Sequence, residues 1–195
     1  MKNLVTYHVH QSPVLPKNDA IFYQYVIAQN GVFVRADNAF VDACIKVASL
    51  KGLSTTIRGL QPLTGWVRLK LPKLSMTLLT TALADAQASV RANQLEETLS
   101  YVVWRNGRYY LIRPNDQQAS PTSVVSMTVE LEEIVVMDIH SHGAAPPYFS
   151  PTDNRDETRL RFYAVLGNVN TSPRWMFRLG IYGYWLELSQ DALFA

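Results

Sequence analysis

The sequence contains almost no cysteine. Its single thiol, Cys44, excludes a disulfide within the chain. A lone thiol is compatible with a reducing compartment, and we therefore expect a cytoplasmic location. Residues 40–47 around it are largely apolar, which predicts a buried thiol rather than a nucleophile.

Long apolar runs and a strong charge of either sign are also missing. No run approaches the roughly 20 residues that a membrane-spanning helix needs, and the first residues lack the apolar core of a signal peptide. The 18 basic and 16 acidic residues leave a net charge of +2, which gives no electrostatic reason to expect nucleic-acid binding. We therefore expect neither a nucleic acid nor a membrane among the partners. The remaining composition, 48% hydrophobic and 17% charged, is that of a globular protein.

The sequence does contain a group of metal-ligating side chains at the end of an apolar run. Residues 134–139 predict a buried strand that leads into His140 and His142. At positions i and i+2 of an extended chain, these two side chains point to the same side. Asp153 follows after a short segment and adds a carboxylate. Two histidines and one carboxylate leave a fourth position open, as in catalytic zinc sites, where the pKa of a bound water falls to about 7.

Ser150 precedes this aspartate in a pattern that also predicts the start of a helix. A serine at the N-cap, Pro151 at the first helical position and the acid Asp153 at the third form a helix-start signature. The predicted helix continues through Val165. Taken alone, capping is the simpler interpretation of Ser150 and Asp153, but the nearby histidines favour a site.

The segment His140-Ser141-His142, a seven-residue spacer, Ser150 and Asp153 together resemble the signature of the JAMM (MPN-plus) metalloproteases. Members of this family remove ubiquitin-like proteins or trim their C-termini. The resemblance covers roughly the last two thirds of the chain. It implies Zn²⁺ held by His140, His142 and Asp153, and a hydrogen bond donated by Ser150 to the oxyanion. It also implies a compact α/β fold in which a curved mixed sheet packs between helices.

The same resemblance implies a general base at the start of an upstream strand. Glu97 is the match, because its spacing to the apolar residues of the strand predicted over 97–104 fits the family's register. The adjacent Glu96 is the competing choice. Gly143 stands where the family usually has proline, and Ser100 where it usually has glycine. These departures concern the subfamily rather than the metal site.

Over its full length the chain resembles the PRTRC system protein A group, which is found in plasmid cassettes beside ThiF-like and ParB-like proteins. This resemblance implies a ubiquitin-like protein as substrate and a ThiF-like activating enzyme as a partner. We expect a zinc-dependent peptidase or isopeptidase that cleaves an amide bond at the C-terminus of a ubiquitin-like protein. Two alternatives are a non-catalytic interaction module of the same fold and a zinc hydrolase of a small amide.

The pattern of elements divides the chain into a small α+β module over residues 1–71 and the metalloprotease-like domain over 72–195. In the module, residues 21–27 and 31–35 predict a hairpin, whereas 38–50 are compatible with a helix or a helix–strand mixture. A second histidine pair in the module, His8 and His10, has no carboxylate at the ligand spacing, and a partly exposed strand explains it better than a metal site does.

In the metalloprotease-like domain, local signals predict a helix and two hairpins. Residues 74–90 have apolar groups at helical spacing, with Ser75 available as the cap. Asn106 and Gly107 predict a tight turn between two strands. A second hairpin is predicted around Gly183 near the end of the chain.

Overall fold

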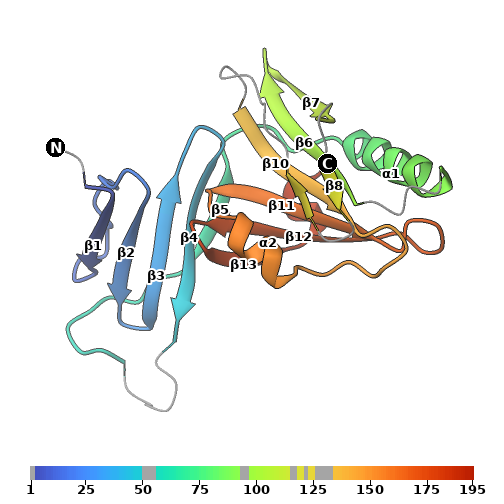
Figure 1. Ribbon diagram of the computed structural model, residues 1–195. Coiled ribbons are helices and arrows are strands. Elements are labelled where there is room, and N and C mark those ends of the chain that lie inside the picture. The colour runs from blue at the N-terminus through green and yellow to red at the C-terminus, as the bar shows by residue number, and fades with distance from the viewer. Residues whose placement is uncertain (1–2, 50–55, 93–96, 115–117, 121–122, 126–133) are drawn as a thin grey trace. The chain divides into compact units, whose positions relative to one another are not determined.

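The computed structural model describes residues 3–49, 56–92, 97–114, 118–120, 123–125 and 134–195. These residues form an α/β fold with two mixed sheets, one small sheet and few helices (Figure 1). The chain divides into two compact units. One consists of Met1–Pro72 with Ile181–Tyr184, and the other of Lys73–Gly180 with Trp185–Ala195.

The sheet of the first unit contains five strands in chain order. They are β1 (Val5–Val9), β2 (Tyr23–Ala28), β3 (Gly31–Asp37), β4 (Val41–Ala48) and β5 (Trp66–Leu69). The first two strands pair in parallel and the others are antiparallel, so the predicted β2–β3 hairpin is confirmed. Residues 38–50, for which the sequence was compatible with a helix or a helix–strand mixture, contain β4. The backbone of β4 pairs with strands on both sides. That pairing on two edges outweighs its weak helical spacing.

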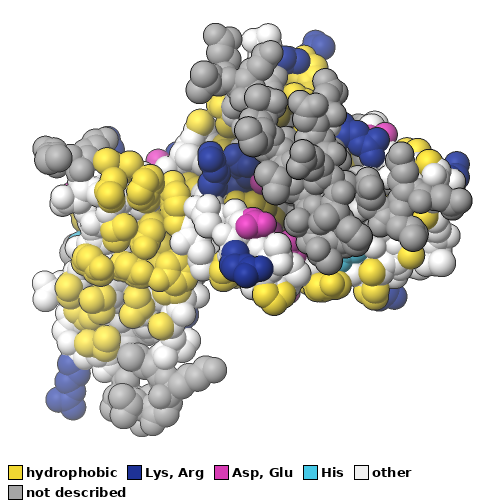
Figure 2. Space-filling view, in the orientation of Figure 1, with side chains coloured by type: hydrophobic (Ala, Val, Ile, Leu, Met, Phe, Trp, Pro, Cys, Tyr) yellow, Lys and Arg dark blue, Asp and Glu magenta, His cyan; other side chains and the backbone are white. Residues whose placement is uncertain are grey.

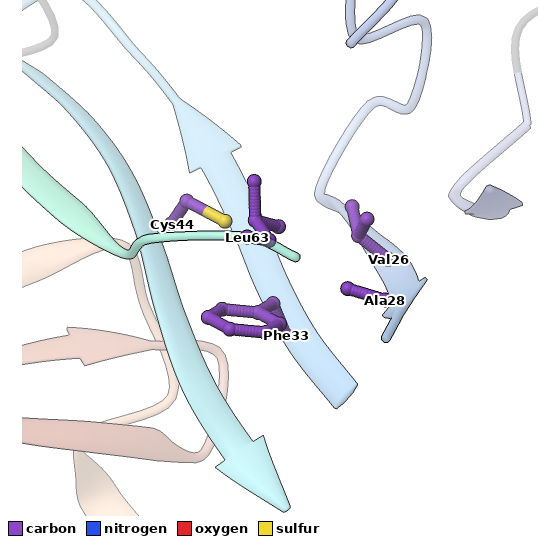
Figure 3. Close-up of a cluster of buried hydrophobic side chains, with 5 residues drawn as sticks. All are labelled: Val26, Ala28, Phe33, Cys44 and Leu63. Atoms are coloured by element: carbon purple, nitrogen blue, oxygen red, sulfur yellow. The ribbon is translucent and has the colours of Figure 1, made fainter. Parts of the chain in front are cut away.

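Cys44 lies in the core of this sheet. Figure 3 shows its sulfur beside the side chains of Val26, Ala28, Phe33 and Leu63. The thiol is fully buried, and this burial raises its pKa to about 12. The prediction that Cys44 is buried is confirmed.

The surface of the first unit is also rich in apolar groups. Hydrophobic side chains gather over its sheet on the face shown in Figure 2. Among its described residues, the large apolar side chains that the unit exposes are those of Leu4, Tyr7, Val9, Val14, Ile21 and Phe22. The second unit also exposes large apolar residues, among them Met76, Tyr110, Tyr148, Trp185 and Leu186.

The second unit is built on a six-stranded sheet with the order β13-β12-β11-β10-β6-β7. The strands are β6 (Thr98–Arg105), β7 (Arg108–Ile112), β10 (Ile134–Ser141), β11 (Arg161–Gly167), β12 (Arg174–Ile181) and β13 (Tyr184–Leu188). A separate hairpin contains β8 (Gln118–Ser120) and β9 (Ser123–Val125). β10 and β11 pair in parallel, whereas β6–β7, β6–β10 and β11–β12 are antiparallel.

Helices α1 and α2 lie on opposite faces of this sheet. Helix α1 (Met76–Arg91) begins at the predicted cap, Ser75, whose side chain accepts a hydrogen bond from a backbone N–H. Its residue Ala86 packs with Leu166 of β11. Leu166 follows Val165, which lies opposite His140 in the register, so Leu166 and His140 point to opposite faces. Helix α2 (Pro151–Asp156) lies on the His140 face, and the short α3 (Gln190–Leu193) follows β13.

The prediction of a helix that continues to Val165 is wrong. Helix α2 ends at Asp156, and β11 inserts between β10 and β12 instead. No residue of α2 is buried, so the helix has no apolar face on which to continue. The apolar and aromatic side chains of β11 gain burial and backbone pairing with strands on both edges. None of the helices in the described ranges combines the length and apolar character of a membrane span.

Candidate metal centre

Two histidines converge at the end of β10. His140 lies in the strand and His142 lies just beyond it, and their Nε2 atoms are 3.2 Å apart. Two nitrogens bound to one tetrahedral zinc at about 2.05 Å would lie about 3.3 Å apart. The spacing of the two imidazoles therefore fits a single divalent ion.

Asp153 adds a carboxylate from the first turn of α2. Its Oδ1 lies 3.6 Å from Nε2 of His140. One ligand atom from each of His140, His142 and Asp153 lies within 4.8 Å of the others, and this is the one group of three such residues within the described ranges. The structure thus brings together the three residues that the sequence nominates as metal ligands.

The capping box at the start of α2 orients this carboxylate. The backbone N–H of Ser150 donates to Oδ2 of Asp153 at 2.5 Å, while Oδ1 faces His140. In return, Oγ of Ser150 accepts from the backbone N–H of Asp153 at 3.1 Å. The predicted helix start is confirmed, and capping does not compete with a metal site because the two functions use different oxygens of Asp153. The hydroxyl hydrogen of Ser150 is not used by the capping bond.

The segment after His142 fixes the orientation of its ring. Nδ1 of His142 lies 3.2 Å from the carbonyl oxygen of Pro146. A carbonyl only accepts, so Nδ1 carries the hydrogen of that bond, and Nε2 of the neutral ring keeps a free lone pair. The ring of Tyr148 packs edge-on at 4.5 Å between centroids. A hydrogen bond of this kind on the outer nitrogen is typical of histidines that bind metals.

The same segment is held against β11. The carbonyl of Ala145 accepts a hydrogen bond from the N–H of Asn168, and the carbonyl of Gly143 accepts one from Val169. A Cβ on Gly167 would meet backbone atoms of residues 145–147. This close approach requires glycine at position 167, because any side chain there would push the segment away.

His140 has an electrostatic environment that suits a metal ligand. Burial lowers its pKa to about 4, and the neighbouring His142 and Arg178 act in the same direction, while Asp153 opposes them. The imidazole is therefore neutral near pH 7. A neutral imidazole is the form that binds a metal.

Glu97 lies beside this cluster at the start of β6. Its Oε1 is 4.0 Å from Nε2 of His142. Burial raises the pKa of Glu97, and Asp153 adds to the rise, while His142 opposes it. The competing choice, Glu96, lies outside the described residues. Thr98, the next residue, bonds through its hydroxyl to Ser141 at 2.9 Å, which fixes the start of β6 against the end of β10.

An ion pair that the sequence reading missed lies on the same face of the sheet. Arg178 in β12 is buried, and its Nε donates to Oε2 of Glu157 at 2.6 Å. Glu157 is the C-cap residue that follows the last residue of α2. The available signal was the position of Arg178 within the apolar run 175–181, because a charged residue buried in a strand requires a partner.

Comparison with known proteins identifies a family. A family model described as prokaryotic homologs of the JAB domain matches residues 80–178, which are 99 of the 195 residues. That span contains Glu97, both histidines, Ser150 and Asp153. No curated protein sequence matches the chain.

Two solved structures are similar at a low level. Protein DSY2949 from Desulfitobacterium hafniense is 15% identical, with a TM-score of 0.42 over 59% of this chain and 88% of that chain. AF2198 from Archaeoglobus fulgidus, a JAB1/MPN domain protein, is 18% identical, with a TM-score of 0.38 over 62% of this chain and 97% of that chain. These values are too low to add to the match of the family model.

Proposed function

The chain belongs to the prokaryotic homologs of the JAB domain, and we propose that it is a zinc-dependent peptidase or isopeptidase. The bond cleaved is an amide at the C-terminus of a ubiquitin-like protein. The observation that carries the proposal is the convergence of His140, His142 and Asp153, whose ligand atoms lie within 4.8 Å of one another. This donor set suits zinc and leaves a coordination position open for chemistry.

The three ligands are prepared for the metal by the chain itself. Burial holds His140 neutral, and Pro146 directs the lone pair of His142 towards the cluster. The backbone N–H of Ser150 fixes the carboxylate of Asp153. A zinc ion held there would polarise the scissile carbonyl and lower the pKa of a coordinated water towards about 7.

Glu97 is the proposed general base and acid. Its Oε1 is close enough to the cluster to take a proton from the attacking water and then to deliver it to the leaving nitrogen. Burial raises the pKa of Glu97 above its ordinary value, which makes the carboxylate a better proton acceptor. Glu97 would therefore contribute proton transfer rather than metal binding.

Ser150 is the proposed oxyanion donor. Its Oγ accepts the capping hydrogen bond from Asp153, which leaves its O–H able to donate elsewhere. A donor directed at the developing oxyanion contributes up to about 3 kcal/mol to transition-state stabilisation.

The proposed substrate class and partners rest on resemblance to the PRTRC system protein A group. A ubiquitin-like protein with an extended tail would be the substrate, and a ThiF-like activating enzyme a cytoplasmic partner. The alternative of a non-catalytic module loses support, because a full set of three ligands and a nearby glutamate lie within the described residues. A small-amide hydrolase differs from the proposal only in substrate.

A direct test uses the zinc-loaded protein and a ubiquitin-like protein extended beyond its terminal Gly-Gly by a short peptide. We expect cleavage after Gly-Gly, detected by mass spectrometry, and loss of cleavage in His142→Ala. His8→Ala is the matched control, because His8 lies outside the cluster. If the zinc-loaded protein leaves both this bond and an isopeptide-linked substrate intact, the proposed activity is wrong. Hydrolysis of small amides alone would favour the alternative of a small-amide zinc hydrolase.

A further inference from the structure

Helix α2 has little of its own to hold it in place. It is six residues long and none of its residues is buried. Isolated helices of this length are unstable in water. Yet Asp153 lies in its first turn and Ser150 caps it, so the site depends on where this helix lies.

The C-terminal end of α2 is tied to the sheet by Arg178. Both Nε and Nη2 of Arg178 contact Oε2 of Glu157, at 2.6 Å and 2.5 Å, and both side chains are only 6% exposed. The backbone N–H of Glu157 donates to the carbonyl of Asp153 at 2.8 Å. Through Glu157, the guanidinium is therefore linked to the backbone of the proposed ligand.

The N-terminal end of α2 is held by the same side chain. The guanidinium carbon of Arg178 lies 3.7 Å from the ring centroid of Phe149, which directly precedes Ser150. The ring of Trp185 lies 5.0 Å from the same carbon. An arginine makes such a double contact because its planar face stacks on aromatic rings while its N–H groups bind a carboxylate.

Arg178 itself is anchored on a rigid element. It lies in the middle of β12, opposite Tyr163 of β11, and Tyr163 lies opposite Asp138 of β10. Side chains two residues apart in a strand point to the same face, so Asp138 and His140 share a face of the sheet. The register places Arg178 on that face too. Arg178 therefore connects the sheet that carries His140 with helix α2, which carries Asp153.

We propose that Arg178 is a positioning residue that clamps both ends of α2 and so holds Asp153 and Ser150 opposite His140 and His142. The consequence for metal binding rests on the proposed function, whereas the clamp itself does not. Arg178 acts through Glu157 and Phe149 and touches no reacting group. Its loss is expected to loosen α2 selectively and to weaken the contribution of Asp153 to the site.

The variants must separate this role from general stability. Removing Arg178 alone would leave the carboxylate of Glu157 buried and unpaired, which is strongly destabilising. The double variant Glu157→Leu with Arg178→Met replaces the pair by apolar groups of similar size, a change that buried ion pairs often tolerate. Arg178→Lys keeps the charge but loses the planar face that stacks on Phe149. The control is Asp138→Leu with Arg161→Met, which replaces a neighbouring ion pair of 2.8 Å and 3.0 Å contacts.

The first readout is amide hydrogen exchange by NMR in the metal-free protein. The N–H groups of Asn154 and Glu157 donate to carbonyls of Ser150 and Asp153 within α2. In the Glu157→Leu/Arg178→Met variant we expect the protection factors of the amides at positions 154 and 157, corrected for the changed side chain at 157, to fall at least tenfold, while strand amides keep their protection. Arg178→Lys should give intermediate exchange, and the control pair should leave α2 unchanged. Unchanged exchange at both α2 amides in the double variant would overturn the clamp.

The second readout is zinc affinity, measured by competition with a chelator. We expect the Glu157→Leu/Arg178→Met variant to bind zinc at least tenfold more weakly than the wild type, and the control pair to bind it within about twofold. Wild-type affinity in the variant would overturn the link between the clamp and Asp153. If the wild type itself binds no zinc, the proposed function fails, and the exchange measurement still decides whether Arg178 clamps α2.

Discussion

Oε1 of Glu97 lies 4.0 Å from Nε2 of His142, although the two residues belong to different strand ends. The cause is the register of β6 and β10, in which Thr98 lies opposite Ser141 as the last antiparallel pair. Glu97 and His142 each lie one residue beyond that pair, where the start of β6 lies next to the end of β10. The pairing of the two strands thus places the proposed base beside a proposed metal ligand.

Glu97→Gln should separate metal binding from turnover. A carboxamide cannot take up the proton, so we expect a loss in kcat of about 10²-fold or more, with zinc content unchanged. Zinc analysis and the ubiquitin-like cleavage assay on the same sample measure both quantities. Glu187→Gln, at an exposed position of β13, is the control and should retain full activity. Full activity in Glu97→Gln would move the assignment to Glu96 or to another mechanism.

Substitutions of Ser150 should distinguish capping from catalysis. Ser150→Ala removes the side chain of the cap, which should cost about 1 kcal/mol in the free energy of unfolding. It also removes the proposed oxyanion donor, which should lower kcat about 10²-fold to 10³-fold. Ser150→Thr retains a hydroxyl and should keep most of both. If Ser150→Ala loses stability but keeps kcat under folding conditions, Ser150 is a cap alone.

Gly167→Ala should damage the metal centre from the opposite strand. The added Cβ would meet the backbone of residues 145–147, which also supplies the carbonyl of Pro146 to His142. We expect a loss of about 1–3 kcal/mol in the free energy of unfolding, as for overpacked sites, and weaker zinc binding. Urea denaturation and zinc titration test this prediction. Gly183→Ala is the control for zinc binding: its Cβ meets no neighbour within 4 Å, so backbone strain at φ +93° should lower stability while zinc binding stays unchanged.

Cys44 should resist alkylation in the folded protein. Burial raises the pKa of its thiol from 9.0 to about 12, so the thiolate fraction at pH 8 is lower by about a thousandfold. We expect reaction with a thiol reagent to be slower by at least this factor in buffer than in denaturant. Rapid labelling of the native protein would show that the core around Val26 and Phe33 opens readily.

Signals confined to a few neighbouring residues predicted their part of the fold well. The caps at Ser75 and Ser150 depend on hydrogen bonds within a few residues, and the apolar spacing of α1 is a local pattern in the sequence. These features could therefore be predicted from the sequence alone. The end of α2 was not predictable in this way, because the apolar residues Leu160, Phe162 and Val165 fit a helical face as well as a strand. Only pairing with β10 and β12 distinguishes the two.

The candidate site shows the same division. His140, His142 and Asp153 were identified because their chemistry and spacing are local properties. The position of Glu97 depends on the register between β6 and β10, which residue spacing within one strand does not determine. Arg178 depends on a contact between β12 and the end of α2, so the sequence indicated that it needs a partner without indicating which one.

The most direct test of the metal centre is the zinc content of the purified protein beside that of Asp153→Ala. Elemental analysis should find about one zinc per chain in the wild type and little in the variant. Asp156→Ala, at an exposed position of the same helix, should retain the metal. The absence of zinc from the wild type, even after zinc is supplied, would contradict the catalytic account and favour a non-catalytic member of the family.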